Sequence, residues 1–192
     1  MESLNDLIWK LILQNELGGN EAAALRFSNA SSKSGLSFGV SQLDITHNDQ
    51  AVACLKECGF TNEELTSLKA KTCDWRSMST RLAGHADIIQ KYDEAQLKYC
   101  LDKSLNFALS HGVSMDNTSA ILAAADYDNQ YGSEGDQMLT YLESLGKPFT
   151  AEDILSFKLN HTLYGRENPG DCKRRYDNIA KVLNKEETNG EA

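Results

Sequence analysis

LNDLIWKLILQNELGG, residues 4–19, is the stretch of sequence that decides the fold class. Its apolar residues recur at spacings of three and four, at Leu4, Leu7, Ile8, Leu11 and Ile12. This spacing places them on one face of an amphipathic helix. The glycine pair at 18–19 is a typical helix end. We therefore expect a first helix that carries Glu16 in its last turn.

Helical patterns dominate the rest of the chain. The 192 residues include only two prolines, so little of the sequence is set against helix formation. Further helices are expected at 49–58, 62–71, 76–91, 93–111, 117–130, 135–145, 151–163 and 171–184. Residues 20–48, which are rich in Ser, Asn and Gly, predict loops or short strands. The predicted fold is all-α, with two helical lobes around a groove and a short irregular or β-like insertion after the first helix.

The expected domain organisation is one catalytic domain over residues 1–184, followed by a disordered acidic tail at 185–192. A hydrophobic content of 41% is enough for one core or two small lobes. Two helix starts are marked by capping residues. Thr150 with Asp153 resembles a capping box, and Asp49 is the expected cap of the helix that begins near it.

The net charge of −9 argues against a nucleic-acid partner, because phosphate binding needs a concentrated basic face. The one basic cluster, residues 173–175, is diluted by neighbouring acids and is expected to lie on a solvated helix face. No apolar run approaches the roughly 20 residues needed to cross a bilayer, so no membrane partner is expected. The acidic start of the chain lacks a signal-peptide pattern, so we expect synthesis in the cytoplasm without a signal peptide.

The five cysteines are Cys54, Cys58, Cys73, Cys100 and Cys172. Cys54 and Cys58 have a helical spacing that could serve a metal, but no second pair supplies the other ligands. They are more simply small buried apolar residues, and the odd number fits a reducing compartment. The four histidines are scattered and form no ligand motif. We expect neither a metal nor a cofactor.

Two carboxyl groups stand where a glycosidase would need them. Breaking a glycosidic bond requires a protonated carboxylic acid beside the leaving oxygen and, in most such enzymes, a second carboxylate. Burial and the negative end of a helix both disfavour a charged carboxylate. Both effects are expected to act on Glu16 in the last turn of an apolar helix. Asp44, at the end of the Gly/Ser-rich segment 37–44, is the candidate base or water-positioning group. Its alternative role is a turn or cap residue.

The segment Ser37-Phe38-Gly39-Val40-Ser41-Gln42-Leu43-Asp44 is similar to the Gly-Phe-Gly-Leu-Met-Gln-Val-Asp segment of goose-type lysozymes. It resembles less closely the corresponding segment of soluble lytic transglycosylases. In both families a catalytic Glu precedes this segment at a helix end, and Glu16 falls there. The stretch 121–129 is similar to their Ala-Ala-Tyr-Asn segment, with Tyr127 as the matching aromatic residue. The chain thus resembles the lysozyme-like superfamily, although Ser41 replaces Met and acidic residues flank Tyr127.

The resemblance implies substrate-binding roles for three further residues. Ser37 and Gln42 would bind an N-acetyl group or support the acid, and Tyr127 would contact the sugar or Glu16. Each has a structural alternative, as a loop residue that satisfies the backbone or as a core aromatic residue. Asp126 and Asp128 compete for a catalytic or cation-binding role, but a solvated helix end explains them equally well.

The expected activity is that of a muramidase, which cleaves the β-1,4 bond between N-acetylmuramic acid and N-acetylglucosamine in bacterial peptidoglycan. Alternatives are a lytic transglycosylase, a chitinase or chitosanase, and a catalytically silent module that binds glycan or protein. The protein is expected to be made without a signal peptide and to act on the cell wall after release or secretion. These features are typical of a phage endolysin or an antibacterial effector. The acidic charge favours the effector, for which a basic inhibitor or immunity protein is the expected partner.

Overall fold

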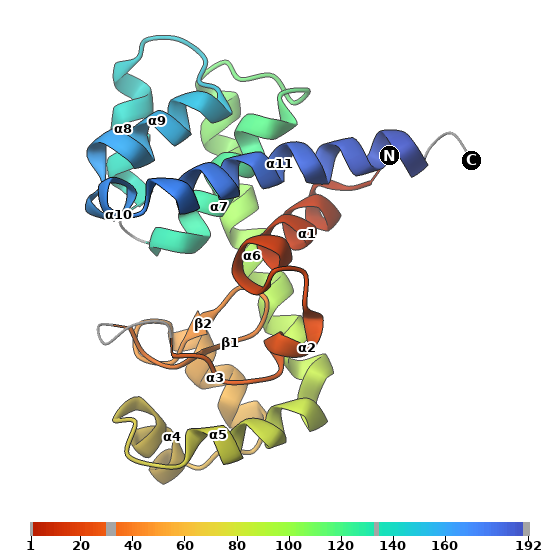
Figure 1. Ribbon diagram of the computed structural model, residues 1–192, viewed down its shortest axis with the longest axis vertical. Helices are drawn as coiled ribbons and strands as arrows, with labels where there is room; N and C mark the ends of the chain where they lie inside the picture. Colours follow the sequence, from red (N-terminus) through yellow and green to blue (C-terminus); the bar gives the residue numbers. More distant parts are fainter. Residues whose placement is uncertain (1, 30–33, 133–134, 190–192) are drawn as a thin grey trace. The chain divides into compact units, whose positions relative to one another are not determined.

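The computed structural model describes residues 2–29, 34–132 and 135–189 and shows an all-α protein with one small antiparallel sheet (Figure 1). This confirms the predicted fold class and the short β-like insertion after the first helix. The elements are α1 (Leu4–Leu17), α2 (Glu21–Ala24), β1 (Ser37–Phe38), β2 (Leu43–Asp44), α3 (Asp49–Glu57), α4 (Asn62–Lys69), α5 (Trp75–Met78), the 3-10 helix η1 (Ser79–His85), α6 (Ala86–Ser110), α7 (Thr118–Tyr131), α8 (Gly135–Ser144), α9 (Ala151–His161), α10 (Leu163–Glu167) and α11 (Pro169–Asn189).

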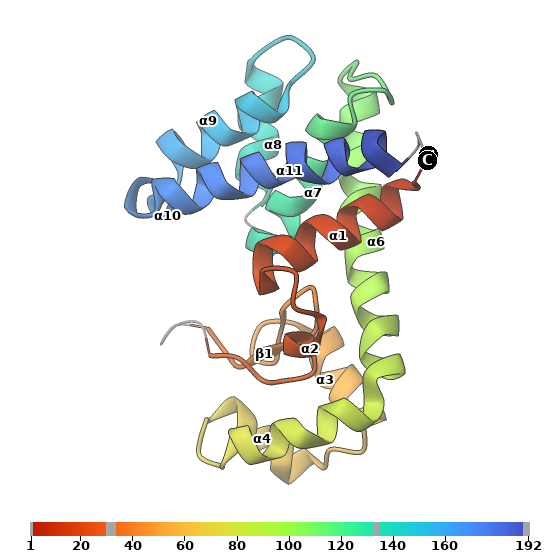
Figure 2. The same ribbon diagram turned by 45° about the vertical axis from the view of Figure 1, so that its right-hand side comes forward.

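The chain divides into two compact units, and each is described by itself. The first comprises Met1–Asn15 with Leu97–Ala192, and the second comprises Glu16–Gln96. In the first unit α7 is the central helix, because every residue from Ala120 to Asp128 is buried. Helices α9 and α11 pack on α7 and on each other, and α1 lies beside α11 (Figures 1 and 2). The apolar face of α1 is buried, as its stripe predicts.

The second unit packs the sheet and α3 to α5 around its own apolar core. Strand β1 pairs antiparallel with β2 in the register Ser37 to Asp44 and Phe38 to Leu43. Phe27 makes edge-to-face contacts with Phe38 and Phe60, whose ring centroids lie 5.8 Å and 6.1 Å away. Such pairs stabilise a core beyond the area they bury. The core therefore fixes the segment that leads into the β1–β2 hairpin.

Capping residues explain where several helices begin. Thr150 and Asp153 form the predicted capping box, with the Asp153 amide donating to Thr150 Oγ1 at 3.2 Å and the Thr150 amide donating to Asp153 at 2.9 Å. The expected cap Asp49 is wrong by one residue. Asn48 is the cap, because its side chain accepts from the Gln50 amide, and Asp49 lies in the first turn.

The prediction of two helices at 76–91 and 93–111 is wrong. The structure has instead a short turn at α5 and η1 followed by one continuous helix, α6. Residues 86–110 contain no glycine or proline, so nothing breaks the helix near Tyr92. The real interruption lies before residue 86, where Gly84 is found. The short helix α10 was not predicted.

The predicted tail at 185–192 overlaps the end of helix α11. Helix α11 continues to Asn189, so residues 185–189 are helical, and residues 190–192 lie outside the described part of the chain. The tail's charged composition favours disorder, but Lys and Glu are also good helix formers, and here the helix propagates through them.

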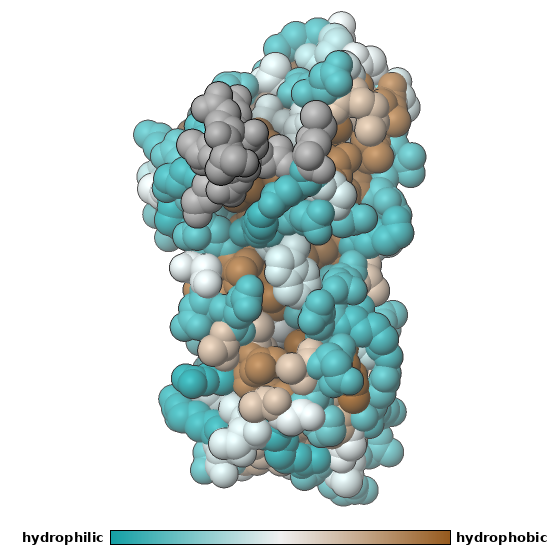
Figure 3. Space-filling model, turned by 90° about the vertical axis from the view of Figure 1, so that its right-hand side faces the viewer, coloured by the Kyte–Doolittle hydropathy of each residue, from teal (hydrophilic) through white to brown (hydrophobic). Residues whose placement is uncertain are grey.

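No helix in the described ranges is long and apolar enough to cross a bilayer. Hydrophilic and apolar residues are interspersed on the face shown in Figure 3.

Candidate active site

Glu16 lies in the last turn of α1, as predicted, and its side chain is half-buried. The helix ends directly after it because Gly18 and Gly19 have φ angles of 60° and 83°. This left-handed conformation is accessible to glycine and closes a helix at its C-terminus. The sequence thus places a partly buried carboxyl group at the point where α1 stops.

The β1–β2 hairpin holds the segment 37–44 in one conformation. Gly39 has φ 78° and Gln42 has φ 54°, and a positive φ is uncommon for a residue other than glycine. The Gln42 side chain compensates by bracing the loop. It donates to the Gly39 carbonyl at 2.9 Å and accepts from Ser28 Oγ at 2.7 Å. Strained backbone of this kind is found at functional sites when its surroundings enforce it.

Asp44 has a defined structural role in the hairpin. One carboxylate oxygen accepts from the Gly35 amide at 2.8 Å, and the other accepts from the amides of Thr46 at 2.7 Å and His47 at 3.2 Å. A carboxylate offers about four lone-pair positions, so about one remains for a water or a substrate hydroxyl. The turn alternative for Asp44 is therefore present in the structure, and the base role stays a prediction.

Ser37 is buried and contributes mainly through its backbone. Its amide donates to the Ser28 carbonyl at 3.0 Å, and its carbonyl accepts from the Ser28 amide at 2.7 Å. This bridge joins Ser28 to strand β1. A substrate contact by Ser37 stays a prediction.

Asp93, which the sequence analysis did not select, fixes the hairpin tip. Its side chain is buried, and it accepts from the Val40 amide at 2.8 Å, from the Ser41 amide at 3.0 Å and from Ser41 Oγ at 2.6 Å. A β-carbon added at Gly39 would lie 2.5 Å from its carboxylate, so the tip needs glycine there. Burial raises the pKa of Asp93 above its usual value, although the three hydrogen bonds act in the opposite direction.

A signal for Asp93 is present in the sequence. It stands four residues after Ile89 and four before Leu97, both of which are buried in α6. An acid within an apolar helical stripe is expected to be buried, and a buried acid needs donors. The donors come from a loop more than fifty residues away, which the helical pattern alone does not reveal.

Tyr127 belongs to the other compact unit, and its structural role there is that of a core aromatic residue. It is 1% exposed, stacks on Tyr131 with centroids 4.4 Å apart, and meets Phe157 edge-on at 5.7 Å. These contacts match the core alternative for this residue. Its predicted contact with the sugar or with Glu16 stays a prediction.

Asp126 and Asp128 do not lie at a solvated helix end, which is a correction. Both are buried in α7, and each is paired with a cation. Asp128 accepts from Lys103 Nζ at 2.9 Å, and Asp126 accepts from Arg175 at 2.6 Å and 3.0 Å. The neighbouring charges hold the pKa of Asp126 below its usual value, although burial opposes this effect.

The basic cluster at 173–175 is only partly solvated. Lys173 and Arg174 are exposed, but Arg175 is buried against Asp126, so the predicted solvated face is wrong for this residue. Arg174 also donates to the carbonyl of Asn15 at 3.1 Å, which ties α11 to α1.

The cysteines are free thiols, and four of them are buried. Burial raises the pKa of Cys54 and Cys58, so these thiols are unreactive apolar residues, in agreement with the interpretation from sequence. Among the described residues, no group of three or more His, Cys, Asp or Glu side chains is placed to hold a metal ion.

Protein-family models, curated proteins and solved structures give no match to this chain.

Proposed function

We propose that this protein is a peptidoglycan glycosidase, a muramidase that cuts the β-1,4 bond between N-acetylmuramic acid and N-acetylglucosamine. The observation that carries the proposal is the position of Glu16, a half-buried carboxyl group in the last turn of α1, two residues before the left-handed Gly18. In the proposed mechanism Glu16 protonates the glycosidic oxygen as the bond breaks. General acid catalysis of this kind contributes about 10²- to 10⁴-fold to the rate.

The braced hairpin supports the proposal. Gln42, Asp44 and Asp93 fix its backbone through hydrogen bonds from both sides. Such rigidity suits a site that must hold a sugar ring in a reactive orientation, because misplacement of the reacting groups slows catalysis. Ser37 and Gln42 are the proposed contacts for the N-acetyl group.

The second half of the reaction has two candidate nucleophiles. Asp44 positions a water through its remaining lone pair in the first route, and the product then ends in ordinary reducing muramic acid. In the second route the muramyl 6-hydroxyl attacks, as in lytic transglycosylases, and an anhydro product forms. We favour hydrolysis, because Asp44 directly follows the Gln42 loop and the resemblance there is closest to the lysozyme branch.

The biological setting we propose is attack on bacterial peptidoglycan by an effector or an endolysin after release from the producing cell. The net charge of −9 favours an effector whose partner is a basic inhibitor or immunity protein. The competing functions are a chitinase or chitosanase that uses the same acid, and a binding module that does not use it.

Lysis assays with two variants test the proposal. Glu16→Gln keeps the size of the side chain but removes its proton, so wall lysis should fall by about 10²-fold or more. Glu21→Gln, at an exposed acid in the first turn of α2, is the matched control and should lyse at the wild-type rate. Equal lysis by both variants, with unchanged circular dichroism, would remove Glu16 from the mechanism. Loss of lysis in both variants would show that the removal of one negative charge, rather than the loss of the acid at Glu16, abolishes lysis.

A further inference from the structure

A pocket lies between α7, α9 and α11 in the unit that contains Leu97–Ala192. Its empty volume is about 250 Å³, including the part that is open to solvent. Because that figure includes open solvent, the enclosed space is smaller, and any occupant must be small. Its wall is apolar at Ala123, Ile154, Leu155 and Ile179 and polar at Asp126, Lys158 and Arg175.

Asp126 at the base of this pocket already has its counter-ion. Arg175 binds the carboxylate through two hydrogen bonds, from Nε at 3.0 Å and from Nη2 at 2.6 Å. The Asn15 amide adds a third hydrogen bond at 2.8 Å, and Asn15 is itself held by Asn178 at 2.9 Å. A bidentate pair of this kind is strong and well oriented, so Arg175 neutralises the charge of Asp126 without a further cation.

Lys158 is the second cation of the pocket, and it lacks an equivalent partner. Its side chain is 5% exposed, and its ammonium nitrogen lies 3.7 Å from Asp126, beyond hydrogen-bond length. The structure gives this nitrogen no hydrogen-bond acceptor within the described part of the chain. Two cations thus share one carboxylate in a largely buried place. Buried charges are normally paired and hydrogen-bonded.

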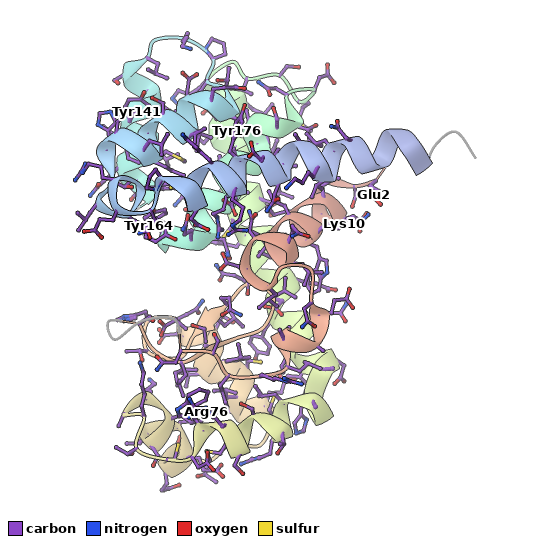
Figure 4. The ribbon with its side chains drawn as sticks, viewed as in Figure 1. Glu2, Lys10, Arg76, Tyr141, Tyr164 and Tyr176 are labelled. Atoms are coloured by element: carbon purple, nitrogen blue, oxygen red, sulfur yellow. The ribbon has the colours of Figure 1, made fainter. Side chains whose placement is uncertain are left out.

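The groups that face Lys158 do not supply the missing acceptor. From α7 it faces Asp126, and from α11 it faces Arg175, Cys172 and, at longer range, Asp171. Burial lowers the pKa of Lys158 below its usual value and Arg175 acts in the same direction, whereas the charge of Asp126 opposes this shift. Tyr176, which lies on α11 in Figure 4, is also part of the pocket wall, but its hydroxyl donates to Glu152 on α9.

We propose that this pocket binds a small carboxylate, whose oxygens accept from Lys158 Nζ and whose short apolar body lies against Ala123, Ile154 and Ile179. The single unmatched ammonium fits one negative charge better than the several charges of a phosphate. The apolar part of the wall, at Ala123, Ile154 and Ile179, fits a short alkyl chain. The carboxylate completes the charge balance of the cluster, with two anions for two cations. This site is independent of the proposed activity of Glu16.

Titration of the ¹⁵N-labelled full-length protein by NMR at pH 6 tests the proposal. Sodium acetate and sodium butyrate are added at an ionic strength held constant with sodium chloride, and n-butylamine hydrochloride serves as the cationic control. Butyrate should give saturable shifts at the amides of residues 123, 154–158 and 172–176. Half-saturation is expected on the order of 1 to 10 mM from the usual affinity per atom of small ligands. Acetate should bind more weakly, and butylamine should give no saturable shift.

Two variants locate the site. Lys158→Met keeps the length of the side chain without its charge and should raise the butyrate dissociation constant at least about tenfold. Lys98→Met, at an exposed lysine on α6, should leave it unchanged. The proposal fails if the unaltered protein shows no saturable shift with butyrate, whether or not the variants fold. It also fails if chloride alone gives the same shifts, or if Lys158→Met binds butyrate as tightly as Lys98→Met does.

Discussion

Replacement of Asp93 by asparagine should destabilise the β1–β2 hairpin tip. The carboxylate accepts three hydrogen bonds, from the Val40 amide and from the amide and hydroxyl of Ser41. Asparagine keeps the shape but has one accepting oxygen. If that oxygen serves Ser41, the amino group of asparagine faces the Val40 N–H, and a buried donor is left without an acceptor. Such a donor costs about 1 to 3 kcal/mol.

Two further effects adjust this magnitude. The two hydrogen bonds to Ser41 lose their charge, which removes about 1 kcal/mol from each. Against this, asparagine relieves the cost of burying a charged carboxylate, the same cost that raises the pKa of Asp93. The net loss of unfolding free energy is expected to be about 1 to 3 kcal/mol. For a chain of this length that corresponds to a fall in Tm of about 2 to 12 °C.

The assay for Asp93→Asn is urea unfolding combined with amide hydrogen exchange at Val40 and Ser41. Exchange there should accelerate at least about tenfold if the tip opens locally. Glu94→Gln is the matched control, because Glu94 is exposed and bonds only Gln90 among the contacts described for it. A loss of less than about 0.5 kcal/mol in Asp93→Asn, with wild-type exchange at both amides, would refute the assigned role.

Three further predictions concern charge. Arg175→Met should lower the unfolding free energy by about 3 to 5 kcal/mol, because the buried Asp126 loses two charge-assisted hydrogen bonds and keeps only the Lys158 ammonium at 3.7 Å. Arg174→Met, which removes an exposed side chain, should cost less than about 1 kcal/mol in the same urea titration. The pKa of Asp126 lies below its usual value of 3.8, so its stabilising contribution is present above pH 3.8 and is lost as pH falls through the lowered pKa. The difference in unfolding free energy between wild type and Asp126→Asn should therefore narrow below pH 3.8. The pKa of Asp93 is raised, so the sign is opposite: the difference between wild type and Asp93→Asn should be largest below pH 3.8 and should shrink as pH rises through the raised pKa. Denaturation curves measured between pH 2 and 7 check both pH predictions. If the two stability differences change with pH in the same direction, the opposite pKa shifts given to Asp126 and Asp93 are contradicted.

Local patterns in the sequence predict the local parts of this structure. The apolar stripe and glycine pair predict α1 and its end at Leu17, and Thr150 with Asp153 predicts the start of α9. These features depend on residues a few positions apart, so one sequence contains the whole signal. The prediction placed a break between two helices near Tyr92, whereas α6 is continuous there. No glycine or proline inside α6 marks such a break.

The buried charges were harder to predict, because their partners are distant in the sequence. Asp126 is matched by Arg175 and Asp93 by the amides at 40 and 41. The apolar stripe around Asp93 indicates that this acid is buried, but the sequence does not reveal which groups pair with it or with Asp126. Asp44 shows the same limit for the candidate site. Its position predicts both a turn and a catalytic base, and its hydrogen bonds reveal the turn role without testing the other.

Mass spectrometry of the products from purified peptidoglycan tests the central claim most directly. The protein is incubated with the polymer, and the soluble fragments are compared with those from Glu16→Gln and Glu21→Gln under the same conditions. We expect wild type and Glu21→Gln to release disaccharide-containing fragments that end in reducing N-acetylmuramic acid, and Glu16→Gln to release almost none. Fragments lighter by one water would keep Glu16 but assign the nucleophile to the substrate rather than to a water held by Asp44. Release of no glycan fragment by the folded wild-type protein would contradict the account.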